Sequence, residues 1–97
     1  MPFKVRDVRR ALQKKGFVES TDRHHIYLHH RYNGKETSAY TLVSHGADKD
    51  DVGAPLVGKM KKQLHLTSSR EVDDLVNCPM SEAQYVVRLK KAGVISG

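Results

Sequence analysis

The first stretch of the chain places apolar and charged residues at the spacing of an amphipathic helix. Val5, Val8 and Leu12 recur three to four residues apart, and lysines and arginines fill the positions between them. Gly16 follows, and glycine readily adopts the left-handed conformation that ends many helices. The two lysines before it lie where the negative end of the helix dipole favours cations. The pattern therefore predicts a helix over residues 4–15.

A strand-like pattern comes next. Residues 17–20 form one short β-prone run, and two longer runs cover residues 24–32 and 35–44. Asn33-Gly34 joins the longer runs, and both residues tolerate the positive φ angles that a type I′ hairpin turn requires. The pattern therefore predicts a three-stranded antiparallel meander.

A two-residue hairpin turn also predicts which residues lie opposite each other, because the turn sets the register. The expected pairs are Tyr27–Tyr40, Ile26–Thr41, His25–Leu42 and His24–Val43. Two faces of the sheet are apolar enough to be the core face, and they carry Ile26, Leu28, Ala39 and Val43, or Tyr27, Tyr40 and Leu42. Side-chain alternation by itself therefore leaves the choice of buried face open.

Helical periodicity returns after an acidic loop over residues 47–53. Pro55 suits the first turn of a helix, because proline loses no intrahelical hydrogen bond there. Leu56, Met60 and Leu64 then form an apolar stripe with lysines outside it, which we interpret as the core side of a second helix.

Helix-capping patterns occur twice in the last third of the chain. A serine precedes a glutamate or glutamine by three residues at Ser68–Glu71 and again at Ser81–Gln84. The elements expected here are a third helix that ends near Asn77 and a fourth over residues 82–92, separated by Cys78-Pro79.

Together these elements describe an α+β protein, with a helix, a three-stranded antiparallel meander, a second helix and two C-terminal helices. Ninety-seven residues are enough for one domain with one modest core. Because the chain has no linker-like, repetitive or low-complexity stretch, we expect residues 1–97 to form a single domain.

The charge pattern adds a candidate partner. The formal net charge is +6, and residues 1–20 alone carry six basic and two acidic groups, whereas residues 67–97 are balanced. A basic surface attracts phosphate backbones without regard to sequence, and salt weakens that attraction steeply. We therefore expect nucleic acid as the partner.

The chain also carries signals about its compartment. No apolar run approaches the roughly 20 residues that a membrane helix needs, and the first residues lack the apolar part of a signal peptide. The single cysteine, Cys78, has no partner for an internal disulfide, which is typical of a reducing environment. These observations favour a cytoplasmic protein without a membrane partner.

Histidines are the most prominent candidates for chemistry, because histidine both accepts and donates protons near neutral pH. Four of them, His24, His25, His29 and His30, spell His-His-x-x-x-His-His. In a strand, His25 and His29 would lie about 13 Å apart at roughly 3.3 Å per residue. Zinc needs its ligands at about 2.0–2.1 Å, so no metal site is expected here. A site that takes one histidine from each of several elements, such as His45, stays as an alternative.

The order of several short segments resembles the HicA family of mRNA-interferase toxins. The matching segments are Leu12 to Phe17 (LQKKGF), His24 to Tyr27 (HHIY), Thr41 to Gly46 (TLVSHG) and Leu56 to Leu66 (LVGKMKKQLHL). The resemblance covers residues 4–66 and implies a double-stranded-RNA-binding-like fold over residues 1–66, with residues 67–97 as a helical extension.

The resemblance implies a metal-independent endoribonuclease that needs no cofactor, cleaves mRNA, inhibits translation and is neutralised by a HicB-like antitoxin protein. The catalytic histidine of the family falls on His24, with His25 as the alternative. An imidazole there can deprotonate a ribose 2′-hydroxyl or protonate the leaving 5′-oxygen. The basic residues expected to bind RNA are Arg9, Arg10, Arg23, Lys59, Lys61 and Lys62.

The chain departs from the family pattern in its C-terminal extension, residues 67–97, and in the two residues next to the expected catalyst. The family has Gly-Ser where this chain has Asp22-Arg23, which changes the backbone freedom and the charge beside His24. Two alternatives to the nuclease therefore stay open. One is a non-catalytic RNA-binding domain of the same fold, and the other is a protein–protein interaction module with negligible affinity for RNA.

Overall fold

The helices and strands follow one another in the order that the hydrophobic pattern predicts. The computed structural model describes residues 3–77 and 79–95. The elements are α1 (Val5–Gln13), β1 (Phe17–Thr21), β2 (His25–Tyr32), β3 (Lys35–Ser44), α2 (Ala54–Gln63), α3 (Ser69–Val76) and α4 (Glu82–Lys91). The strands form one antiparallel sheet in the order β1-β2-β3. The predicted α+β fold is confirmed, and Cys78, expected between the last two helices, lies outside the described residues.

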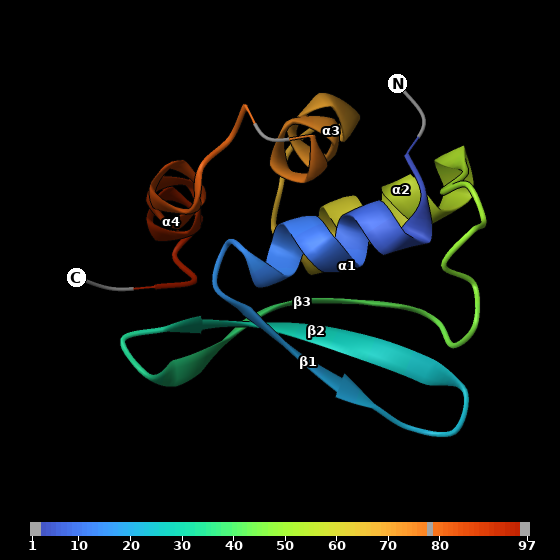
Figure 1. Ribbon diagram of the computed structural model, residues 1–97. Helices are drawn as coiled ribbons and strands as arrows, with labels where there is room; N and C mark the ends of the chain where they lie inside the picture. Colours follow the sequence, from blue (N-terminus) through green and yellow to red (C-terminus); the bar gives the residue numbers. More distant parts are fainter. Residues whose placement is uncertain (1–2, 78, 96–97) are drawn as a thin grey trace.

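The helices of the described residues all lie on one side of the sheet (Figure 1). α1 runs across the sheet, and α2 lies behind α1 in this view, on the same side of the sheet. α3 packs on the side of both helices that faces away from the strands. α4 lies over the end of the sheet that carries the β2–β3 turn. The other face of the sheet has no helix of residues 3–77 or 79–95 over it.

Burial along the strands identifies the core face. Ile26, Leu28 and His30 of β2 are buried, as are Ala39 and Val43 of β3. The residues between them point to the outer face, because side chains alternate along a strand. The core face is therefore the first of the two candidates that the sequence left open.

The register of the β2–β3 hairpin differs from the prediction. Arg31 lies opposite Glu36 next to the turn, as expected. An irregularity between His29 and Arg31 then shifts all later pairs by two residues. The observed pairs are Ile26–Val43, Tyr27–Leu42, His25–Ser44 and His29–Tyr40. They replace the predicted Ile26–Thr41, Tyr27–Tyr40 and His25–Leu42, and the predicted His24–Val43 pair is also wrong, because β2 begins at His25.

Thr37 gives the physical reason for the shift. Residues 37–39 of β3 lie opposite the single residue His30 of β2. The Thr37 hydroxyl donates to the His30 carbonyl oxygen and accepts from the Ala39 N–H, each at 3.2 Å. A side chain thus replaces hydrogen bonds of the regular ladder. Because the shift is two residues, every side chain keeps the face that alternation predicts.

The C-terminal helices begin at the predicted caps. The Ser68 hydroxyl accepts from the Glu71 N–H at the start of α3. At the start of α4, Ser81 and Gln84 form the full capping box, in which each side chain accepts from the other residue's N–H. These bonds satisfy donors that the first turn of a helix leaves without intrahelical partners.

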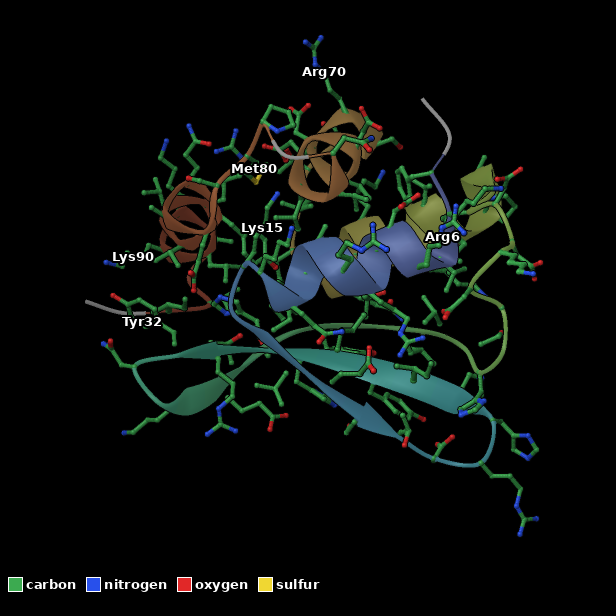
Figure 2. All side chains as sticks on the ribbon, viewed as in Figure 1. Arg6, Lys15, Tyr32, Arg70, Met80 and Lys90 are labelled. Carbon is green, nitrogen blue, oxygen red and sulfur yellow. The ribbon has the colours of Figure 1, made fainter. Side chains whose placement is uncertain are left out.

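A buried aromatic cluster fixes α4 to the rest of the fold. The Tyr85 hydroxyl donates to the Leu64 carbonyl oxygen at 2.8 Å. The Tyr85 ring lies 5.7 Å from the Phe17 ring and meets the His30 ring edge-on at 5.3 Å, between ring centroids. Tyr32 and Lys90 lie close together at the same end of the molecule (Figure 2), with the Lys90 ammonium 5.5 Å from the centroid of the Tyr32 ring.

Candidate nucleic-acid site

The β1–β2 turn presents the expected catalytic histidine at one end of the sheet. The Asp22 carboxylate accepts the backbone N–H groups of His24 at 2.8 Å and His25 at 2.6 Å. The His24 carbonyl oxygen in turn accepts the N–H of His45, which follows β3, at 2.9 Å. Three histidines from two segments therefore meet at this end, and backbone hydrogen bonds hold the segments together.

Asp22 lies two residues before His24, and its carboxylate holds the turn together. Hydrogen bonds from the N–H groups of His25 and His24, in that order, lower the pKa of its carboxyl group. The Tyr27 hydroxyl is a further donor to the same carboxylate, and its own pKa is raised by that bond. An anionic side chain thus stabilises the turn that carries His24, and sequence reasoning missed this role.

The imidazoles of the turn are accessible and separate. His24 is exposed and His25 is half-buried, and their ring centroids lie 6.5 Å apart with the planes at 72°. Two neighbouring imidazoles with accessible surface are the kind of pair that general acid–base chemistry uses.

Lys59 lies beside this turn. A concavity of about 260 Å³ is lined by His25, Ser44, Lys59, Gln63 and neighbouring apolar side chains of β3 and α2. The structure thus brings Lys59 together with His25 although the two residues are far apart in the sequence. The two other lysines predicted to bind RNA from this helix, Lys61 and Lys62, do not line the concavity.

The two predicted arginines of α1 have different surroundings. The Arg9 guanidinium forms a two-pronged contact with Glu19 at 2.7 and 2.9 Å, and a third guanidinium nitrogen donates to both carboxylate oxygens of Asp48 at 2.7 and 2.9 Å. These two carboxylates raise the pKa of Arg9, Glu19 more than Asp48. Arg9 is therefore engaged within the protein, whereas Arg10 is exposed.

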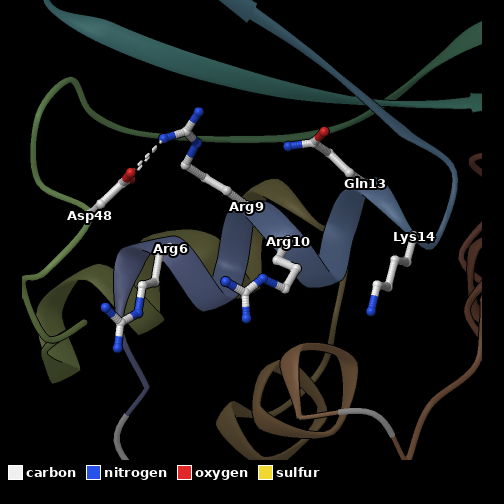
Figure 3. Close-up of a pocket in the computed structure, with 6 residues that line it drawn as sticks. All are labelled: Arg6, Arg9, Arg10, Gln13, Lys14 and Asp48. Atoms are coloured by element: carbon white, nitrogen blue, oxygen red, sulfur yellow. Dashed lines mark hydrogen bonds and ion pairs between the residues drawn. The ribbon is translucent and has the colours of Figure 1, made fainter.

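Arg10 belongs to a basic stripe that the sequence analysis only partly identified. Arg6, Arg10 and Lys14 follow one another at four-residue intervals, so they share one face of α1. With Arg9, Gln13 and Asp48 they line a concavity of about 430 Å³ (Figure 3). The four-residue spacing could have identified Arg6 and Lys14 from the sequence. We call the three exposed cations Arg6, Arg10 and Lys14 the α1 stripe.

The four-histidine motif does not converge on one point. His25 and His29 lie on the outer face with the Tyr27 ring between them, 6.2 Å and 6.0 Å from their centroids. His30 points into the core, where burial lowers its pKa. Across residues 3–77 and 79–95 there is no cluster of three or more histidine, cysteine or acidic side chains placed to hold a metal ion.

Comparisons of the chain with protein-family models, with curated proteins and with solved structures found no match. Among the described residues, no helix combines the length and the apolar character needed to cross a membrane. A functional proposal therefore has to stand on the geometry and chemistry of the histidine turn and the basic surfaces.

Proposed function

We propose that this protein is a HicA-like endoribonuclease that cleaves mRNA at the histidine turn. The observation that carries the proposal is the pair His24 and His25 at the end of the sheet, with both N–H groups held by Asp22, His24 exposed and His25 lining one concavity with Lys59. The net charge of +6 supports an anionic polymer as substrate.

The proposed reaction uses the ribose 2′-hydroxyl as the nucleophile. One imidazole takes the proton of this hydroxyl while the 2′-oxygen forms a bond to phosphorus. The bond from phosphorus to the 5′-oxygen breaks, and the second imidazole donates a proton to that oxygen. The products are a 2′,3′-cyclic phosphate and a 5′-hydroxyl, so no metal or cofactor enters the balance.

The spacing of the two rings supports these roles. The attacking and leaving oxygens lie on opposite sides of phosphorus, and each must come within about 2.6–3.2 Å of its imidazole nitrogen. The ring centroids of His24 and His25 lie 6.5 Å apart, so both imidazoles are close to the same point at the end of the sheet. Arg23, which precedes His24 in the chain, and Lys59, which shares a concavity with His25, are the candidates to stabilise the charge that develops on the non-bridging oxygens.

By the same resemblance we propose a HicB-like antitoxin protein as the partner. A protein that covers an exposed histidine turn blocks access of RNA without any change in the turn itself. His24 is exposed on the free protein, which is compatible with such a mode of inhibition.

A non-catalytic RNA-binding domain is the second candidate, and the α1 stripe favours it. Arg6, Arg10 and Lys14 are exposed cations that lie on a helix rather than on the histidine turn. A stripe of this kind binds phosphates without chemistry.

An RNA cleavage assay in EDTA tests the nuclease. We expect the wild-type protein to cleave a labelled single-stranded RNA, and His24→Ala to lose roughly 10²- to 10⁴-fold in rate while it still binds the RNA. His65→Asn is the matched control, because His65 adopts a positive φ of 59° that asparagine tolerates and it lies at the end of α2.

The outcomes separate the candidates. RNA binding without cleavage by the wild-type protein favours the non-catalytic domain. Unchanged cleavage in both His24→Ala and His25→Ala removes the histidine mechanism, and a wild-type protein that neither binds nor cleaves RNA at low salt removes both candidates.

A further inference from the structure

The outer face of the sheet carries a continuous row of rings. His25, Tyr27 and His29 point outward from β2, because Ile26, Leu28 and His30 between them point into the core. The irregularity at Thr37 places Tyr40 of β3 directly opposite His29, so its ring joins the same face. We call His25, Tyr27, His29 and Tyr40 the ring row.

Neighbouring rings of the row lie at nearly equal distances. The centroids are 6.2 Å apart from His25 to Tyr27, 6.0 Å from Tyr27 to His29, and 6.1 Å from His29 to Tyr40. The planes of the last two pairs are nearly parallel, at 16° and 24°. The row thus runs without a gap from the histidine turn to the middle of β3.

The ring row is open to solvent over part of its surface. Tyr40 keeps 36% of its surface exposed, and the His29 side chain keeps 33%. Val18 of β1, which pairs with His29, is 51% exposed and extends the apolar surface beside the row. Figure 1 shows the helices on the opposite side of the sheet. Exposed apolar and aromatic surface of this kind marks a binding face.

The charges around the row indicate which class of ligand fits it. Exposed cations lie at both ends, with Arg23 beside the histidine turn and Arg31 and Lys35 beside the β2–β3 turn. Carboxylates also contact the row: Glu36 pairs with His29 at 3.1 Å and lies opposite Arg31 in the register, and Asp22 accepts from the Tyr27 hydroxyl. Flat rings flanked by cations suit bases joined by phosphates.

We propose that the ring row is a stacking platform for the bases of single-stranded RNA that leads away from the scissile phosphate at His24. This inference rests on the proposed function, because it takes RNA as the substrate of the histidine turn. Unpaired bases have free faces for stacking on side chains, whereas duplex bases stack on each other. The platform therefore selects unpaired RNA beside the cleavage point.

A binding measurement tests the platform. The non-cleaving variant His24→Gln serves as the parent, and the affinity for a short fluorescein-labelled single-stranded RNA is measured by anisotropy, with the same RNA in a duplex for comparison. We expect Tyr40→Ala to weaken single-strand binding by about 5- to 150-fold, the range for loss of one stacked base. Tyr40→Phe keeps the ring and keeps the affinity.

The salt dependence separates stacking from charge. Tyr40→Ala removes no cation, so the slope of log affinity against log salt concentration stays the same, whereas Arg23→Ala, which removes an exposed cation at one end of the row, reduces it. Tyr32→Ala is the matched control, because Tyr32 is also a tyrosine of this hairpin but lies against Lys90 of α4 (Figure 2).

The results distinguish a failure of the platform from a failure of the proposed function. If the parent binds single-stranded RNA and both Tyr40→Ala and His29→Ala bind it equally well, the platform is wrong and the nuclease proposal stands. A protein partner on the ring row would give that result. If the parent binds no RNA even at low salt, the proposed function fails and the platform fails with it.

Discussion

At the scale of single residues, Asp22 shows how one side chain holds a turn in place. Glycine at a tight turn supplies conformational freedom. Here an aspartate occupies the turn, and its carboxylate holds the two following N–H groups in place. Because both N–H groups bond to the same carboxylate oxygen, His24 has less conformational freedom. A residue that transfers protons benefits from such a fixed position.

Replacement of Asp22 therefore affects the histidine turn more than the fold. We expect Asp22→Ala to lower kcat/KM for RNA cleavage by about 10- to 100-fold, since small displacements of reacting groups have effects of that size. Asp22→Asn retains an oxygen acceptor and should recover most of the rate.

Amide hydrogen exchange at His24 and His25 provides the second measurement for this variant. Exchange should become faster in Asp22→Ala and remain slow in Asp22→Asn. Equal rates of cleavage and exchange in all three proteins would show that the carboxylate does not position the turn.

At the scale of elements, the hairpin separates what the sequence determines from what it does not. Asn33-Gly34 correctly predicted the turn and the pairs beside it, because only certain residues tolerate its φ angles. The later pairs were wrong, because a shift of two residues leaves the apolar pattern of both strands unchanged. The periodicity of apolar residues contains no signal for the hydrogen bonds of the Thr37 hydroxyl with Ala39 of β3 and His30 of β2.

The irregularity in β3 is expected to depend on the Thr37 hydroxyl. Thr37→Val keeps the branched shape but leaves the His30 carbonyl and the Ala39 N–H without this partner, so we expect a loss of about 1–3 kcal/mol in the free energy of unfolding. Urea unfolding measures it. Thr21→Val, an exposed strand threonine, is the control and should change little. Equal stability of the two variants would contradict the role of the hydroxyl.

The basic side chains of α1 illustrate the same limit for the candidate site. Arg9 and Arg10 are adjacent in the sequence and look equivalent as phosphate ligands. Only the fold reveals that Glu19 and Asp48, from β1 and from the loop after β3, both contact Arg9. Composition and helical spacing predict that a basic face exists, but they do not identify which cations the protein itself neutralises.

At the scale of the whole molecule, the sheet and the C-terminal helix share one aromatic cluster that contains a titratable ring. His30 lies between Phe17 and Tyr85 and is fully buried. Its Nδ1 is 3.2 Å from the Thr37 hydroxyl, whereas its Nε2 has no hydrogen-bond partner among the described residues. A proton on Nε2 would place a charge in an apolar contact between two layers of the fold.

Stability should therefore fall in mildly acidic solution. Burial lowers the pKa of His30 in the folded state, so below its ordinary value of about 6.5 the unfolded chain binds more protons than the folded one. The free energy of unfolding is then highest above that pH and decreases as the pH falls through the window below it. Thermal unfolding at a series of pH values measures the slope.

A variant isolates the contribution of His30 from that of other titrating groups. His30→Leu replaces the imidazole with an apolar side chain that cannot be protonated, and we expect a flatter dependence of stability on pH between neutral and mildly acidic solution than in the wild-type protein. Parallel curves would show that His30 does not titrate on unfolding.

The placement of all described helices on one side of the sheet has a consequence for how this protein diversifies. Side chains that bury into the helical layer determine whether the chain folds, whereas those on the opposite side contribute few of the buried residues of the core. Substitutions at Tyr40, His29 or Val18 therefore change recognition at little risk to the fold. Selection is free to retune the preferred ligand on one surface while the other surface preserves the scaffold.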